Sequence, residues 1–110
     1  MLRYSDDGID FWFSNNGPLS EVHLNRGYNG KLETGVSLAS SKQEVFATYG
    51  QPGRVVQTDK LSGRNDERIL YQNGNTSRIY YGRHGLIFWF RDNAINQIVV
   101  FKGKFDVDRL

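Results

Sequence analysis

The chain contains one sequence pattern twice: GIDFWFSNNGPLSEVHL at residues 8–24 and GLIFWFRDNAINQIVVF at residues 85–101. Before the central turn, matching residues of the two stretches are 77 positions apart. After the turn they are 76 positions apart, because Gly17 and Pro18 occupy the place of Ala94 alone. Repeated matches with a single insertion indicate an internal duplication. The matching pairs are Gly8 and Gly85, Phe11 and Phe88, Trp12 and Trp89, Phe13 and Phe90, Asn16 and Asn93, Leu19 and Ile95, Val22 and Ile98, and Leu24 and Val100.

Each stretch predicts a β-hairpin. Hydrophobic residues alternate along the first strand of each stretch, and the turns SNNGP and RDNA are rich in residues that favour turns. The match also extends upstream, because Leu2 and Tyr4 precede the first hairpin as Ile79 and Tyr81 precede the second. If the phenylalanines of each FWF triplet face the core, the central tryptophan lies on the opposite face of the sheet.

The segment between the hairpins predicts one short helix at about residues 41–49. Ser41 with Glu44 three residues later forms the pattern of a capping box. Val45 and Tyr49 lie one turn apart and provide an apolar stripe, with Phe46 beside them. Gly50 is suited to end the helix, and the following proline prevents its continuation.

The strand patterns RVVQT, RILYQ and SRIYY follow the helix, with the polar loop DKLSGRNDE between the first two. The predicted fold class is therefore α+β: a helix at about 41–49 packed on an antiparallel meander sheet, with two homologous hairpins at 8–24 and 85–101. We expect residues 1–110 to form a single domain. Residues 1–24 then form a partial first repeat and residues 33–101 a complete second one.

The first repeat has no helix before it. Two arrangements explain this: the native protein is longer and this chain is its C-terminal part, or the N-terminal hairpin completes one sheet in a single domain. The sequence favours truncation, because every downstream element of the first repeat is present and everything upstream is missing at once. An unfilled repeat also makes hairpin exchange between two copies of the chain conceivable.

Composition excludes several classes of protein. The absence of cysteine excludes disulfides, thiol nucleophiles and cysteine metal sites. No apolar run is long enough to span a bilayer, and the sequence has neither a leader nor a lipid-attachment cysteine. We expect a cytoplasmic protein, or an envelope or secreted one if the chain is a processed fragment. Residues 51–110 carry ten basic and six acidic side chains, which permits weak attraction to acidic partners.

The segment GVSLASSKQEVFATYGQP, a tyrosine-rich strand and then GLIFWFRDNAINQIVV resemble the BamE/SmpA-like family, a bacterial helix-plus-antiparallel-sheet unit that also occurs in tandem in the β-lactamase inhibitory protein. The resemblance covers residues 33–101, with the first hairpin as a partial second copy. It implies a non-enzymatic scaffold or protein-binding inhibitor, and it assigns no functional residue here. The residues that carry it are Gly35, Ser37, Glu44, Val45, Tyr49, Gly50, Pro52, Phe88, Phe90, Asn93, Ile95 and Ile98.

Few residues are candidates for catalysis or metal binding. His23 lies in the strand pattern EVHL and His84 in the turn GRHG, and neither has a serine or threonine that the sequence places beside it. The glycine-rich segment GYNGKLETG lacks the ending of a phosphate-binding loop. We therefore predict no catalytic residues, no metal and no cofactor. The acidic clusters are interpreted as turn residues rather than cation ligands: Asp6, Asp7 and Asp10, Asp66 and Glu67, and Asp106 and Asp108.

The aromatic residues are the most informative candidates for a binding site. On the face opposite the phenylalanines, the second hairpin presents Ile87, Trp89, Val99 and Phe101, which need a cover. Packing within the chain is the first explanation of such a cover, and a protein-contact surface is the second. The predicted contact residues are Trp12, Trp89, Tyr80 and Arg91.

The predicted function is a non-enzymatic protein-binding or scaffold module, with a protein partner or self-association, including a homodimer. A small hydrolase-type enzyme using His23 or His84 is one alternative. A carbohydrate or single-stranded nucleic-acid binder is another, because arginines alternate with tyrosines. Nucleic acid is the less favoured ligand, since no RNP-type motif is present and the net charge is only +2. The residues concerned are Arg64, Arg68, Arg78, Arg83, Arg91, Tyr71, Tyr80 and Tyr81.

Overall fold

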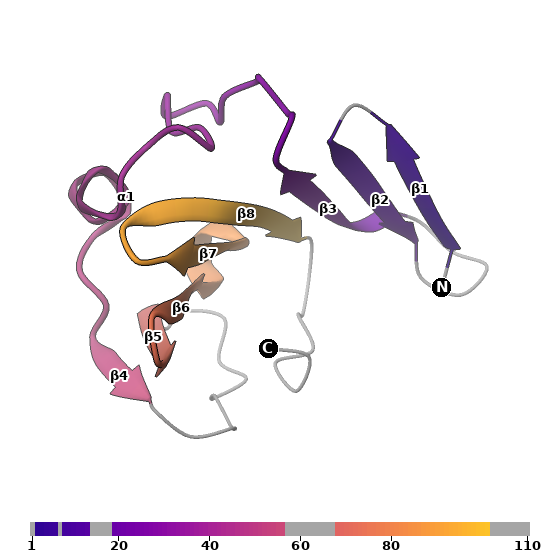
Figure 1. The fold of residues 1–110 in the computed structure, drawn as a ribbon. Helices are drawn as coiled ribbons and strands as arrows, with labels where there is room; N and C mark the ends of the chain where they lie inside the picture. The colour runs from indigo at the N-terminus through magenta and orange to yellow at the C-terminus, as the bar shows by residue number, and fades with distance from the viewer. Residues whose placement is uncertain (1, 7, 14–18, 57–67, 102–110) are drawn as a thin grey trace.

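The computed structural model describes residues 2–6, 8–13, 19–56 and 68–101 (Figure 1). Within these ranges the fold is α+β, with one α-helix and eight strands in one sheet. The elements in chain order are β1 (Leu2–Asp6), β2 (Ile9–Phe13), β3 (Leu19–Asn25), α1 (Lys42–Tyr49), β4 (Arg54–Val56), β5 (Arg68–Asn73), β6 (Thr76–Tyr81), the 3₁₀ turn η1 (Gly82–His84), β7 (Leu86–Arg91) and β8 (Ala94–Phe101).

The strand order is β1-β2-β3-β8-β7-β6-β5-β4. Strands β1 to β3 form one antiparallel meander, β5 to β8 form another, and the antiparallel pair β3–β8 joins them. The N-terminal hairpin thus completes one sheet within the chain, which is one of the two arrangements considered. Figure 1 shows that β1 to β3 extend the sheet away from α1.

Strand β4 corrects the expectation of a wholly antiparallel meander, because it pairs with β5 in parallel. A parallel pair cannot be joined by a tight turn and needs a long crossover connection. The predicted loop DKLSGRNDE lies outside the described residues.

The main core lies between α1 and one face of the sheet. Val45 is fully buried and Tyr49 is nearly so, and both belong to a cluster with Phe88, Phe90 and Ile98. The Tyr49 ring lies 5.6 Å from the Phe88 ring, measured between centroids. Burial of large aromatic side chains dominates the energetics of a core of this size. The expectation that the phenylalanines of the second FWF triplet face the core is confirmed.

The helix has the ends that the sequence predicts. The Glu44 backbone N–H donates to Ser41 Oγ at 3.2 Å, and the Ser41 backbone N–H donates to Glu44 Oε1 at 3.4 Å, which completes the capping box. At the other end, the Gly50 N–H donates to the Phe46 carbonyl at 2.8 Å. Gly50 has a φ of 103°, a backbone angle that residues with a Cβ rarely adopt.

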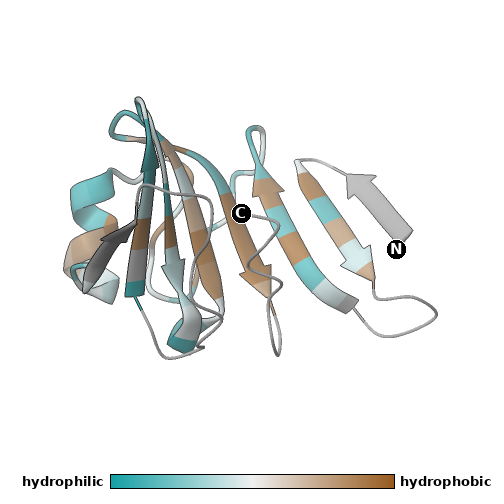
Figure 2. Ribbon diagram, turned by 90° about the horizontal axis from the view of Figure 1, so that it is seen from below, coloured by the Kyte–Doolittle hydropathy of each residue, from teal (hydrophilic) through white to brown (hydrophobic). Residues whose placement is uncertain are grey.

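The opposite face of the sheet carries a second, smaller core. Tyr80 and Ile87 are fully buried, and Val99 and Phe101 expose less than a tenth of their surface. Other parts of the same chain therefore cover these residues, which agrees with the first of the two explanations offered for this apolar face. Figure 2 shows the contrast between the two halves of the sheet: residues of opposite hydropathy alternate along β2 and β3, whereas β8 is more uniformly hydrophobic.

The two hairpins share three backbone features at matching positions. In both hairpins the register of the strand pairing shifts directly after the tryptophan of FWF, between Trp12 and Phe13 in the first and between Trp89 and Phe90 in the second. Both begin at a glycine with positive φ, 83° at Gly8 and 66° at Gly85. The carbonyl of each glycine accepts a hydrogen bond from the N–H of a residue in its return strand, Asn25 at 2.7 Å and Phe101 at 2.9 Å. An added Cβ at either glycine would meet backbone atoms at 2.6–2.7 Å, so both positions require glycine.

Removal of the helix cap tests the local part of this description. We expect Ser41→Ala to lower the free energy of unfolding by about 1 kcal/mol, because the Glu44 N–H loses its acceptor. Urea denaturation measures the change. Gln43→Ala is the control, since Gln43 is exposed on α1 and makes no cap contact, and its effect should stay within about 0.5 kcal/mol. Equal effects of the two substitutions would show that the cap does not stabilise the helix.

Candidate functional site

The predicted contact residues come from three strands. Trp12 lies on β2, Tyr80 on β6, and Trp89 and Arg91 on β7. By strand register, Trp12, Tyr80 and Trp89 share the sheet face opposite α1. They do not form one patch, because β3 and β8 lie between the strand of Trp12 and the strand of Trp89.

Tyr80 belongs to the interior. It is fully buried, and its ring stacks on Phe101 at 5.8 Å between centroids with an interplanar angle of 6°. The alternation of residues along a strand gives the face on which a side chain lies, but it does not tell whether that face is covered. Tyr80 therefore supports the sheet instead of offering a contact surface.

Trp89 is half-buried and lies within a cross-strand row of five half-buried residues. The Arg78 guanidinium carbon is 3.9 Å from the centroid of the Trp89 ring and 5.4 Å from the centroid of the Tyr71 ring. On the other side of Trp89, the Gln97 side-chain amide donates to Asn25 Oδ1 at 2.6 Å. We call this set the Trp89 row; its members are Asn25 on β3, Gln97 on β8, Trp89 on β7, Arg78 on β6 and Tyr71 on β5.

The Trp89 row combines a cation–π pair, Arg78 over Trp89, with the hydrogen-bonded side-chain amides of Asn25 and Gln97. A guanidinium directly over an indole ring is held by electrostatic attraction to the ring face. Burial lowers the pKa of Arg78 from its ordinary value of 12.5, and the nearby Tyr71 opposes this shift. A guanidinium keeps its positive charge in proteins. The row is thus a fixed, half-exposed surface of aromatic, cationic and amide groups.

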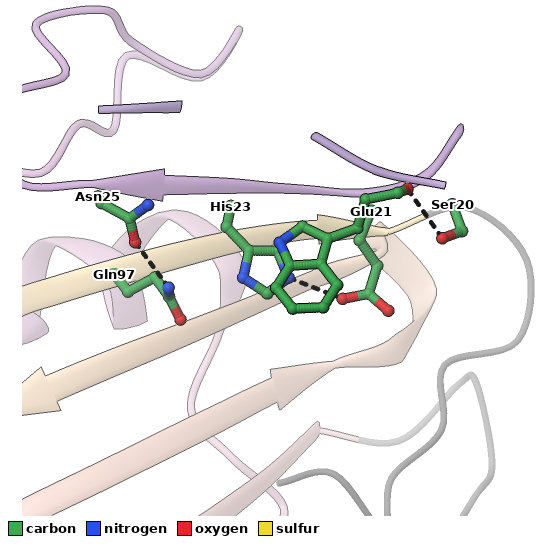
Figure 3. A network of polar contacts seen from close by, with 6 residues as sticks. Ser20, Glu21, His23, Asn25 and Gln97 are labelled. Carbon is green, nitrogen blue, oxygen red and sulfur yellow. Dashed lines mark hydrogen bonds and ion pairs between the residues drawn. The ribbon is translucent and has the colours of Figure 1, made fainter. Parts of the chain in front are cut away.

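Trp12 lies in a different environment. Its indole stacks on the His23 ring at 4.9 Å between centroids with an interplanar angle of 19°. His23 Nε2 lies 2.7 Å from Glu21 Oε1, and the Ser20 hydroxyl donates to the Trp12 carbonyl at 3.0 Å (Figure 3). Asp10, opposite His23 in register, is also buried. We call Trp12, Glu21 and His23 the His23 cluster.

The two histidines have different surroundings. His23 has the Glu21 carboxylate in hydrogen-bond reach, and it does not line the four cavities described for this chain. His84 borders two cavities, but its described contacts are with the edges of Tyr49 and Tyr81 rather than a carboxylate. A histidine base in a cleft needs both features at one residue.

Arg91 is exposed and borders a different region from Trp89. It lines an open groove of about 770 Å³ between the segment that follows β3 and the β7–β8 turn. The exposed Arg26 and the buried Ile95 also line this groove. Arg91 is therefore not part of the Trp89 row.

The described residues contain no group of three or more histidine, aspartate or glutamate side chains that could hold a metal ion. The acidic residues at 7, 66–67, 106 and 108, and Arg64, lie outside the described residues. In the part of the chain that the structure describes, no helix is long and apolar enough to cross a membrane.

Comparisons with known proteins identify no relative. No protein-family model matches the chain, and neither a curated protein nor a solved structure is significantly similar to it. The site must therefore be interpreted from its own geometry.

A double-mutant cycle tests the His23 cluster. Glu21→Gln and His23→Gln should each lower the free energy of unfolding by about 1–2 kcal/mol, because each leaves a buried partner with a poorer hydrogen bond. The double variant should lose less free energy of unfolding than the two single variants together. Urea denaturation should give a coupling energy of roughly 1 kcal/mol between the two positions.

Thr48→Ala combined with His23→Gln is the control. The Thr48 hydroxyl donates to the Glu44 carbonyl on α1 and shares no described partner with His23, so these two effects should add. Additive effects in the Glu21–His23 cycle as well would mean that the 2.7 Å contact contributes nothing to stability.

Proposed function

We propose that this chain is a non-enzymatic protein-binding module and that the Trp89 row contacts the partner. The observation that carries the proposal is the half-exposed indole of Trp89 with the Arg78 guanidinium stacked on it at 3.9 Å. Tryptophan, tyrosine and arginine are the residue types that dominate binding energy at protein interfaces. Their pre-formed stacking also reduces the entropy lost when a partner binds.

The amide pair at the end of the row favours a polypeptide partner. Asn25 Oδ1 and the Gln97 amide nitrogen are used in their mutual bond, while no described hydrogen bond uses the Asn25 amide nitrogen or the Gln97 carbonyl oxygen. These atoms offer one donor and one acceptor, the two groups that a peptide backbone presents. An extended segment crossing the strands can therefore bond to the amides and place an apolar or aromatic side chain against Trp89.

His84 lines two described cavities but has no described contact with a carboxylate, and this supports a binding role over a hydrolase that uses His84. Trp12 and Arg91 are not included in the proposed contact surface, because the first stacks on His23 and the second borders the separate groove. A homodimer is one form that the protein partner can take.

We infer in addition that the two hairpins are copies of one ancestral unit. The matching pairing irregularities, the glycines with positive φ and the matching backbone bonds to Asn25 and Phe101 support this inference. The preceding strands differ, because Leu2 pairs opposite Phe13 whereas its counterpart Ile79 pairs opposite Phe88. The first strand of one copy has thus shifted by two residues.

Kinship with the BamE/SmpA-like family is likewise our proposal. The succession of a capped helix and an antiparallel four-stranded meander, α1 followed by β5 to β8, supports it. The parallel strand β4 departs from the helix-plus-antiparallel-sheet unit that the resemblance implies.

Selection from a random peptide display library tests the protein-binding proposal. We expect the wild-type chain to enrich peptides with an aromatic or apolar side chain. Trp89→Ala and Arg78→Ala should weaken binding of a selected synthetic peptide by roughly tenfold or more, because each removes half of the stacked pair. Titration followed by fluorescence anisotropy of a labelled peptide measures the change.

Arg83→Ala is the control for this experiment, because it removes an exposed arginine from outside the row. It should leave peptide affinity unchanged. Thermal unfolding of every variant checks that the fold persists. The proposal fails if peptides are enriched equally on the Trp89→Ala chain, or if a single-stranded oligothymidine binds the row more tightly than any selected peptide.

A further inference from the structure

A cationic cavity lies on the α1 side of the sheet, opposite the Trp89 row. It has a volume of about 180 Å³ and is lined by Tyr49, Arg68, Tyr81, Arg83 and His84. Arg68 and Tyr81 are opposite each other in register, Arg83 and His84 follow in η1, and Tyr49 is the last residue of α1. Segments far apart in the sequence thus bring three basic side chains to one small space.

The aromatic walls of this cavity are fixed in place. The Tyr81 hydroxyl donates to the Gly50 carbonyl at 2.7 Å, and the Tyr49 hydroxyl lies 2.7 Å from Thr34 Oγ1. The His84 ring meets the Tyr49 ring edge-on at 5.2 Å between centroids. Burial raises the pKa of Tyr81 above its ordinary value of 10, so its phenol stays protonated and uncharged. A ligand therefore meets a largely pre-formed site.

The charge of the cavity is one-sided. Arg68 and Arg83 are exposed, no carboxylate is among the lining residues, and no ion pair within the described part of the chain involves either arginine. The carbonyl end of α1 attracts a basic side chain and accounts for Arg68 beside Gly50. It does not account for Arg83 on a separate element. Two arginines that line one cavity, with no carboxylate among its described lining residues, favour an anion, and their planar donors match phosphate oxygens.

A second cavity of about 280 Å³ adjoins the first, and the two share Tyr49 and His84 as lining residues. Leu32, Leu86 and Val100 give it an apolar lining, and Glu33 places a negative charge there. This cavity therefore repels an anionic group and accepts an uncharged organic one. The two cavities together set the orientation of a ligand that has one anionic end.

We propose that the chain binds a small phosphate monoester, with the phosphate group in the cationic cavity and the organic part in the adjoining cavity. The first cavity is smaller than those that enclose whole drug-sized ligands, so it suits a single phosphate group. This site is independent of the Trp89 row because it lies on the other face of the sheet and shares none of its residues. The two proposals can therefore fail separately.

Isothermal titration calorimetry with phenyl phosphate and inorganic phosphate, at constant ionic strength, tests the site. We expect phenyl phosphate to bind several-fold more tightly than inorganic phosphate. Arg68→Ala and Arg83→Ala should each weaken both ligands by roughly tenfold, since each removes a charge-assisted hydrogen bond. Leu32→Ser should remove the preference for phenyl phosphate and leave inorganic phosphate unaffected.

Arg91→Ala is the matched control, because it also removes one exposed arginine but borders neither of the two cavities. It should leave both affinities unchanged. Equal weakening by Arg91→Ala, or acetate binding as tightly as inorganic phosphate, would overturn the phosphate site. Equal affinity for the two phosphates would overturn the organic half. If Arg68→Ala unfolds the chain, Arg83→Ala in the exposed η1 turn decides the outcome.

Discussion

The pairing of β3 with β8 is the interaction on which the rest of the sheet depends. It places Val22 opposite Val100 and Leu24 opposite Ile98, and so joins the two meanders. Without it, Val22 and Leu24 of β3 would lose their place in the main core, and a small sheet needs a packed apolar face to be stable. The same pairing brings Asn25 beside Gln97 and completes the Trp89 row. The strand order of the sheet and the composition of the candidate site therefore have one cause.

Elements specified by nearby residues could be predicted, and elements specified by distant ones could not. The helix needs only Ser41, Glu44 and Gly50, all within one short segment, and its bounds agree with the prediction. The hairpins likewise contain their own turns and alternation. The parallel pairing of β4 is with a strand that is not directly adjacent to it in the sequence, and no residue within β4 encodes the direction of its neighbour. The pairing of β3 with β8 could not be predicted either, because the sequence left two arrangements of the N-terminal hairpin open.

The side chains of the candidate site could also be predicted only as far as nearby residues specify them. Alternation placed Trp89 on the correct face, and the interleaving of Arg78 with Tyr71 was visible in the sequence. Only the strand register shows that these three residues stack in one row with the Asn25–Gln97 pair. Tyr80 was predicted as a contact residue but is buried. The alternation pattern shows on which face of the sheet a side chain lies, and it does not show whether other residues cover that face. The cationic cavity had no local signal at all, since its residues come from α1, β5, β6 and η1.

The two hairpins of similar sequence give one sheet two unlike halves. At matching positions, Val99 of the second hairpin corresponds to His23 of the first, and Gln97 corresponds to Glu21. The second hairpin buries its outer face, so Trp89 is held beside Arg78 over a second core. The first hairpin instead places an acid and a histidine beside Trp12, whose ring stacks on an imidazole. The two tryptophans, both half-buried, thus contact an imidazole in one hairpin and a guanidinium in the other. The hairpins can differ on this face because their opposite faces both keep the alternation that the shared core requires.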